Sequence, residues 1–337
     1  MKCVVVLFYF KAYFFVTLRE PSVVSLVADI VPPEARGRYL GRVNKATGIV
    51  AMITMLVAGF FISAIGDASQ TAYAILFMLA AAFGYITMWS FSTMTEPRRT
   101  TNHHYTLKDV FKFKQPFSGF CARAMFFRFS AYLASPFASA YMLRDLHLET
   151  RFFGIATATY VLSQILFYRP MGKLADRFGD RVLIVIGVLG TAFTMFLWFN
   201  IRADTLWLIW PTQIMSGAAW AATELAFYNV VLDVTDKKTR PLQIAQYSML
   251  VASAQAVGPI VGGILADSAG LWLITGIPFV FLLSSGMRLI SGVLFLSMHE
   301  PRLKHQYSFR DIVRVARLQR MQHRVQVLPY KQGQKYK

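Results

Sequence analysis

Ionisable side chains inside long apolar segments are the residues of this chain whose types and positions could do chemistry. Glu20 and Glu224 each lie nine residues before an aspartate, Asp29 or Asp233, at the end of an apolar segment. At about 1.5 Å per helical residue, each glutamate is roughly 13 Å deep, near the middle of a hydrocarbon layer about 30 Å thick. An ion at that depth persists mainly where it faces a cavity or a partner. We therefore expect both carboxylates to face the protein interior.

Arg128 lies near the middle of another apolar segment, at a depth similar to that of the two glutamates. Burial and a neighbouring arginine shift the pKa of a carboxyl group in opposite directions, which is the tuning that a proton-coupling site needs. The arginines could equally hold a substrate anion, and the alternative to both is a set of structural ion pairs. For Arg288 we expect a structural role or a side chain that extends to the membrane surface. The predicted substrate or coupling site consists of Glu20, Arg128, Glu224, Arg19, Arg123 and Asn229.

The segments that carry these charges are long enough to span a bilayer. Hydrophobic residues make up 55% of the 337 residues and charged residues only 15%, which is typical of a polytopic helical membrane protein. The sequence predicts an all-α fold with nine spans: one ending at residue 31, then 46–65, 72–92, 120–143, 152–171, 182–199, 206–232, 242–266 and 271–298.

The net charge of +18 would suggest a nucleic-acid partner in a soluble domain, but its location indicates otherwise. Alternate connections between the spans, together with the C-terminal tail, carry twenty-five Lys and Arg residues, and the intervening connections carry three. Basic loops face the cytoplasm in membrane proteins. We therefore expect a plasma-membrane protein with a cytoplasmic C-terminus and no nucleic-acid partner.

The chain repeats itself at a constant offset of 204 positions. Glu20 recurs as Glu224, Asp29 as Asp233 and Arg36 as Arg240, with each pair at the same place relative to an apolar segment. Self-similarity at a fixed period indicates two copies of one structural unit. The first copy is shorter at its N-terminal side than the second, so the sequence predicts a shortened first unit.

The connection at 172–181, Gly-Lys-Leu-Ala-Asp-Arg-Phe-Gly-Asp-Arg, resembles the G-x-L-A-D-R-x-G-R-R loop of the major facilitator superfamily, with Asp180 where the family has a basic residue. The connections at 28–38 and 232–240 resemble those between helices 4 and 5 and helices 10 and 11 of that family. The resemblance implies that the nine spans are helices 4 to 12 of a twelve-helix, parallel-repeat fold that lacks its first three helices here.

The same resemblance implies a division of the chain and roles for its loops. Helices 4 to 6 would form a partial bundle at 1–94, followed by a cytoplasmic linker at 95–118, a six-helix bundle at 119–298 and a basic cytoplasmic tail at 299–337. Glu20, Arg128 and Glu224 would lie on helices 4, 7 and 10, which line the central cavity in this family, so the resemblance implies a Glu/Arg/Glu group at the domain interface. The expected cytoplasmic gating loop contains Gly172, Asp176, Arg177, Gly179 and Arg181, and the inter-helix motifs contain Asp29, Arg36, Asp233 and Arg240.

The gating loop also has a mechanical interpretation from its residues. Gly172 and Gly179 would permit a tight turn, and Asp176 could face the positive N-terminal end of a neighbouring helix. The alternative is a charged turn that merely flanks two membrane helices.

The expected function is secondary transport of a small solute by alternating access, with a proton as the candidate coupling ion. The alternative is a non-transporting sensor or a degenerate transporter remnant. No set of nucleophile, base and orienting group indicates an enzyme, no Gly-rich nucleotide loop is present, and the two cysteines suggest neither a disulfide framework nor a metal site. We expect a monomer without a cofactor, with the solute, the bilayer and anionic lipids at the basic tail as partners.

Overall fold

The computed structural model describes residues 33–298, except 67–68, 94–108, 110–111, 114, 237–238, 269 and 272–273. The predicted first span, with Arg19, Glu20 and Asp29, lies outside the described residues, as does the basic tail at 299–337. The other eight predicted spans lie in the described part, and each contains a helix.

The long helices of the described part follow the apolar segments of the sequence. They are α2 (Pro33–Ile65), α3 (Gln70–Ser92), α5 (Phe117–Ala134), α7 (Thr150–Phe178), α8 (Asp180–Asn200), α9 (Ile209–Val234), α10 (Arg240–Ser268) and α11 (Gly276–Leu296). Within the described part of the chain, α2, α3, α8, α10 and α11 contain stretches that are long and apolar enough to cross a membrane. The all-α, polytopic membrane fold is therefore confirmed.

Short elements connect some of these helices. After α5 the chain forms α6 (Phe137–Ala140) and the π-helical turn Tyr141–Asp145, and the 3₁₀ turn Leu206–Leu208 precedes α9. A two-stranded antiparallel hairpin, β1 (Gly270–Leu271) and β2 (Ile274–Thr275), joins α10 to α11. The last predicted span, 271–298, therefore begins five residues too early, because Leu271, Ile274 and Thr275 belong to the strands and the helix starts at Gly276.

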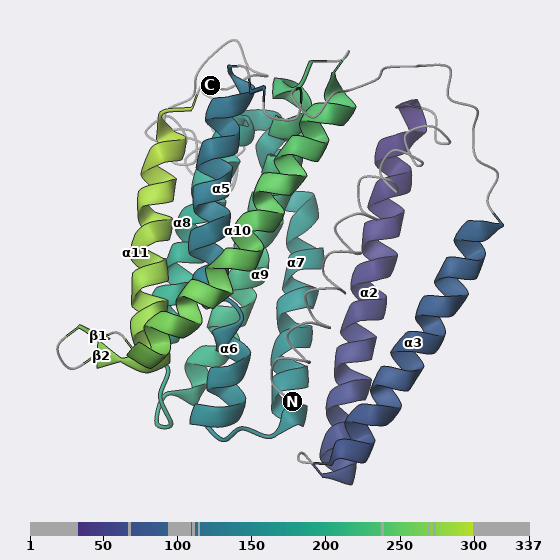
Figure 1. Ribbon diagram of the computed structural model, residues 1–337, viewed down its shortest axis with the longest axis vertical. Coiled ribbons are helices and arrows are strands. Elements are labelled where there is room, and N and C mark those ends of the chain that lie inside the picture. The colour runs from purple at the N-terminus through teal and green to yellow at the C-terminus, as the bar shows by residue number, and fades with distance from the viewer. Residues whose placement is uncertain are drawn as a thin grey trace, which may run out of the picture.

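In Figure 1 the long helices from α5 to α11 form one bundle, and α2 and α3 lie to one side of it. Within this bundle α5 packs against α10 and α11, α8 against α9 and α11, and α7 against α9. Helix α2 packs along α7. At their closest approach, a Cβ added to Gly154 would lie 3.0 Å from the carbonyl oxygen of Met55, so the two helices meet backbone to backbone.

Aromatic rings fill the core of the bundle. Phe227 of α9 makes edge-to-face contacts with Phe120 and Phe127 of α5, at centroid distances of 5.7 and 5.5 Å. Such pairs stabilise a core by about 1 kcal/mol each beyond the area they bury. A second cluster, around Tyr141 and Phe281, fills the opposite end of the bundle. The helices that position the candidate site are thus fixed at both ends.

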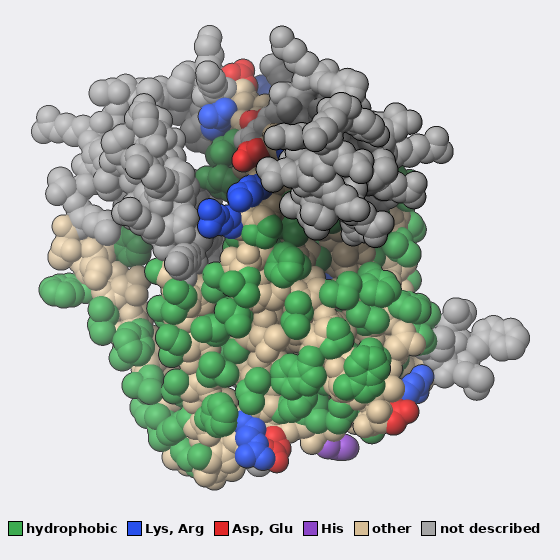
Figure 2. Space-filling model, turned by 180° about the vertical axis from the view of Figure 1, so that it is seen from behind, with side chains coloured by type: hydrophobic (Ala, Val, Ile, Leu, Met, Phe, Trp, Pro, Cys, Tyr) green, Lys and Arg blue, Asp and Glu red, His purple; other side chains and the backbone are tan. Residues whose placement is uncertain are grey.

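The surface has the distribution expected of a protein in a bilayer. On the face that Figure 2 shows, hydrophobic side chains form a broad belt, and most charged side chains in view lie toward its two ends. Large exposed hydrophobic residues on α3, such as Phe77, Phe83 and Trp89, and on α11, such as Ile290 and Val293, contribute to the apolar surface. A continuous apolar surface of this kind needs lipid around it. The chain is an integral membrane protein.

Candidate substrate and coupling site

An ion pair between two helices is the centre of the candidate site. Arg128, on α5, donates two parallel hydrogen bonds to Glu224, on α9: Nη1 to Oε1 at 2.6 Å and Nη2 to Oε2 at 2.9 Å. Guanidinium and carboxylate groups match in this two-pronged geometry, which is stronger and more directional than a single contact. The structure therefore brings together two residues that the sequence analysis assigned to one site.

The two partners differ in their access to solvent and ligands. The Arg128 side chain is 6% exposed, whereas that of Glu224 is 39% exposed. The guanidinium carbon of Arg128 lies 5.7 Å from the ring centroid of Trp220 and 5.3 Å from that of Phe227, within the range of cation–π attraction. The arginine is therefore held by its surroundings, and the carboxylate is the partner that another molecule or a proton can reach.

Tyrosines from two further helices surround this pair. Tyr160 and Tyr168 on α7 and Tyr247 on α10 all lie within electrostatic range of the Glu224 carboxylate. The buried Nε of Arg128 has no hydrogen-bond partner among the described residues. The site thus combines a carboxylate with phenol groups and aromatic faces around the buried guanidinium of Arg128.

Close packing fixes the helix that carries Glu224. A Cβ added at Gly217 of α9 would lie 2.4 Å from the carbonyl oxygen of Tyr160, so α9 and α7 touch backbone to backbone. Ser163 donates to the carbonyl of Ile214 at 2.6 Å, and Gln213 donates to that of Ala156 at 3.0 Å. These contacts fix the position of α9 relative to α7.

Two other residues predicted for the site lie elsewhere. Arg123 donates to the carbonyl oxygen of Leu294 at 3.0 Å and to Oγ of Ser297 at 3.2 Å, and so caps the C-terminal end of α11. The side-chain amide of Asn229 donates to Oδ1 of Asp180 at 2.8 Å. Neither side chain makes a hydrogen bond to the central pair.

The expected gating loop at 172–181 is almost entirely helical. Helix α7 continues to Phe178 and α8 begins at Asp180, so Gly172, Asp176 and Arg177 are helical residues. Only Gly179, with φ of 88°, makes the turn, and the expectation that Gly172 helps to form it is wrong. The segment 173–177 continues α7 past its apolar part, because four of its five residues, Lys, Leu, Ala and Arg, have high helix propensity.

The other charges of this segment also have defined surroundings. The Asp176 side chain is exposed, and the Arg177 guanidinium lies 5.1 Å from the ring centroid of Phe178. Arg181 donates to the carbonyl oxygen of Leu296, so that Arg123 and Arg181 both cap the end of α11. Cations at a helix C-terminus stabilise it through the helix dipole.

The inter-helix motif residues lie at helix ends. Arg240 donates to Oγ1 of Thr235 at 3.1 Å and to the carbonyl oxygen of Leu232 at 3.0 Å, which caps α9. Asp233 lies in the last turn of α9. Arg36 lies within α2, which begins at Pro33, so the basic connection before residue 46 is helical and not a loop, while the apolar span itself begins at Ala46 as predicted. Pro at the first position followed by Glu34 is a helix-start signal that the apolar pattern alone does not include.

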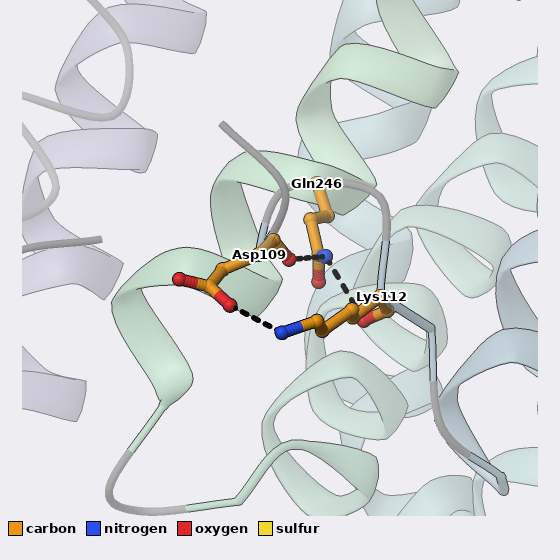
Figure 3. A network of polar contacts seen from close by, with 3 residues as sticks. All are labelled: Asp109, Lys112 and Gln246. Atoms are coloured by element: carbon orange, nitrogen blue, oxygen red, sulfur yellow. Dashed lines mark hydrogen bonds and ion pairs between the residues drawn. The ribbon is translucent and has the colours of Figure 1, made fainter. Parts of the chain in front are cut away.

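The sequence analysis missed a contact between the linker and α10. Gln246 is buried, and its Nε2 donates to the carbonyl oxygens of Asp109 and Lys112 at 3.2 and 3.3 Å (Figure 3). Lys112 in turn pairs with Asp109 at 2.9 Å. No sequence signal predicts this contact, because a glutamine in a membrane helix has many possible partners.

Together these features define a polytopic helical membrane protein whose buried ion pair joins two helices of one bundle. The comparisons identify its family. A profile described as Major Facilitator Superfamily matches residues 120–330, more than half of the chain. The chain belongs to the Major Facilitator Superfamily, whose members are transporters and not enzymes.

Several resistance proteins are similar to part of the chain. Multidrug resistance protein 1 of Bacillus subtilis (strain 168) is 27% identical over 161 residues, which cover 48% of this chain and 39% of that protein. Tetracycline resistance protein, class H, of Pasteurella multocida is 26% identical over 151 residues, or 44% of this chain and 36% of that protein. Tetracycline resistance protein, class C, of Escherichia coli is 30% identical over 129 residues, or 37% and 31%. The chain thus spans less than half the length of these curated relatives.

Proposed function

We propose that this chain works in secondary transport of a small solute by alternating access, with the Arg128–Glu224 pair as its central switch. The observation that carries the proposal is the asymmetry of the pair, a buried arginine bound to a carboxylate that is 39% exposed. An ionised pair this deep in a membrane protein is energetically costly, and such pairs occur mainly at functional sites.

The pair can open in two chemically distinct ways. A proton that binds Glu224 removes the negative charge and leaves Arg128 held by the rings of Trp220 and Phe227. A cationic group could instead take the carboxylate, which it would reach from the exposed side. In both cases the attraction between α5 and α9 weakens, and this is the local change that a switch between two conformations needs.

For the substrate we propose an organic compound with aromatic and polar groups. The tyrosines near Glu224 and the ring of Trp220 support this class by their chemistry. The relatives named for multidrug and tetracycline resistance support it independently. Tetracycline, which has both kinds of group, is therefore the first probe.

We also propose a location in the plasma membrane with the C-terminus in the cytoplasm. The excess of Lys and Arg in alternate connections and in the tail supports this orientation. It would place the turn at Gly179 and the end of α11 on the cytoplasmic side. The candidate gating segment would then face the compartment from which an exporter collects its substrate.

The experiment compares two modes of tetracycline flux in proteoliposomes that contain the chain or its Glu224→Gln variant. If the carboxylate carries the coupling proton, the variant loses accumulation driven by a pH gradient but keeps exchange of labelled for unlabelled compound without a gradient. Equal accumulation by both proteins at several pH values would refute the coupling role. Binding without any flux by the unaltered chain would favour the alternative, a non-transporting sensor or a remnant.

A further inference from the structure

Arg288, in the middle of α11, is the second fully buried arginine of the bundle. Its side chain makes four hydrogen bonds to protein acceptors. Nε donates to Oγ of Ser284 at 3.1 Å and Nη1 to the carbonyl oxygen of Thr191 at 3.0 Å. Nη2 donates to the carbonyl oxygen of Ala131 at 2.8 Å and to Oγ of Ser135 at 3.2 Å. The side chain therefore does not extend to the membrane surface, and that alternative for Arg288 is wrong.

The charge of Arg288 is not balanced by a carboxylate among the described residues. Its four partners are two backbone carbonyls and two hydroxyls. A buried cation with only dipolar partners is costly, and a leucine would fill the space between apolar helices without that cost. What Arg288 provides that a leucine cannot is a set of hydrogen bonds to two neighbouring helices.

These bonds belong to a short row of polar contacts that holds α11 between two neighbours. Ser284 donates to the carbonyl oxygen of Ser130 on α5 at 2.6 Å, next to the Ala131 carbonyl that Arg288 binds. Ser285 donates to the carbonyl oxygen of Ala192 on α8 at 2.9 Å, next to the Thr191 carbonyl that Arg288 binds. Donors from α11 thus bind two consecutive carbonyls on α5 and two on α8. Two bonds to each helix fix its rotation as well as its distance from α11.

The hydrogen bonds from Ser284 and Arg288 reach α5 close to the point where that helix is interrupted. Helix α5 ends at Ala134, and α6 begins at Phe137 after a turn at Ser135 and Pro136. Pro136 has no N–H to donate, so the regular hydrogen-bond ladder stops here. Arg288 binds both the Ala131 carbonyl in the last turn and the Ser135 hydroxyl in the interruption itself.

Helix α10 approaches the same turn closely. A Cβ added at Gly262 would lie 2.1 Å from the carbonyl oxygen of Leu133, so no larger residue fits without movement. The interruption is therefore bounded by the guanidinium of α11 and by the backbone of α10. It has a fixed position along α5, about two helical turns after Arg128.

We propose that Arg288 is a positioning residue that fixes the end of α5 and so holds Arg128 in register with Glu224. Ser130 and Ala131 follow Arg128 by two and three residues, which is less than one helical turn. A rotation of α5 that moves their carbonyls also moves the Arg128 guanidinium away from the two-pronged geometry. The inference concerns the ion pair of the proposed function, but it does not require that the pair drives transport.

The test is a double-mutant cycle on the unfolding midpoint of the purified full chain in detergent. Glu224→Gln is measured alone and in the Arg288→Met background, and coupled residues give non-additive effects. If Arg288 positions Arg128, the midpoint shift caused by Glu224→Gln falls to less than half in the Arg288→Met background. An unchanged shift would overturn the proposal, since a merely structural role of Arg288 lowers the midpoint without changing the effect at Glu224.

Two further variants make the test decisive. Arg123→Met is the matched control, because Arg123 also donates to a carbonyl of another helix but at the end of α11, and it should leave the Glu224→Gln shift unchanged. If Arg288→Met does not fold, Ser284→Ala is used instead, since it removes the hydrogen bond to the Ser130 carbonyl of α5. It should reduce the midpoint shift caused by Glu224→Gln, but to a smaller degree. Additive shifts with Ser284→Ala would overturn the proposal in that case. Neither measurement uses transport, so each proposal can fail without the other.

Discussion

The structure predicts a sharp difference between two carboxylates that both pair with arginine. Glu224 pairs with Arg128, which is 6% exposed, through two charge-assisted hydrogen bonds. Glu149 pairs with Arg151, and the two side chains are 53% and 56% exposed. Replacement of each glutamate by glutamine removes one negative charge and almost no volume. Any difference in stability between the variants therefore reports the surroundings of the arginine that remains.

The magnitude follows from what Arg128 loses. Removal of one partner of a fully buried pair costs about 3–5 kcal/mol, because the remaining charge stays buried without compensation. Three features reduce this figure here: the carboxylate is 39% exposed, the glutamine amide still accepts one hydrogen bond, and two aromatic rings attract the guanidinium. We expect Glu224→Gln to lower the free energy of unfolding by roughly 2 kcal/mol. For Glu149→Gln we expect less than about 0.5 kcal/mol, as is usual for an exposed pair.

The assay is equilibrium unfolding of the purified chain in mixed micelles, followed by circular dichroism of the helices. Both variants and the unaltered chain are measured in the same detergent, and the slopes are compared to check that the unfolding transition stays the same. Equal losses for the two variants would refute the reasoning, because burial of the arginine would then make no difference. A loss below about 0.5 kcal/mol for Glu224→Gln would also refute it.

Two further predictions concern packing and the linker. Gly217→Ala should destabilise the chain by about 1–3 kcal/mol, because the new Cβ meets the backbone of α7. Gly286→Ala has open space around the new Cβ and should stabilise α11 by up to about 1 kcal/mol. A similar effect of both variants on the unfolding curve would contradict the contact between α9 and α7. Gln246→Leu should release the linker and make tryptic cleavage after Lys112 roughly fivefold faster, the equivalent of about 1 kcal/mol of hydrogen bonding. The control Gln255→Leu on the same helix should leave the cleavage rate unchanged, and a rate that is also unchanged in Gln246→Leu would exclude the contact.

The sequence predicted the architecture well because apolar length determines it. Eight of the nine predicted spans coincide with helices of the described part, and the family is the one that the 172–181 motif indicated. Helix ends were predicted less well, since α2 and α7 extend into polar segments. A hydrophobic pattern marks only the part of a helix that lies in lipid, and it ends before the helix does at Phe178.

Pairing between distant residues was only partly predictable. Depth and helix assignment selected Arg128 and Glu224, but the predicted site also included Asn229 as a polar residue of the same helix, and Asn229 binds Asp180 instead. Glu224 and Asn229 are five residues apart on α9, which is one full turn plus about 140° around the helix axis. Their side chains therefore point to different sides. A choice between such residues needs the rotation of each helix, which follows from packing of the whole bundle.

Three arginines of the bundle illustrate why residue type and depth do not determine the role of a buried charge. Arg123 reaches the end of α11 and caps its carbonyls, Arg288 is enclosed by carbonyls and hydroxyls, and Arg128 is paired with a carboxylate. The partners of Arg123 and Arg288 are neutral groups of the protein itself, and neither a proton nor a solute can exchange with them easily. Only Arg128 has a partner whose charge can be removed or competed for. The switch that we propose therefore acts at the Glu224 end of that pair, whereas Arg123 and Arg288 hold α11 against its neighbours.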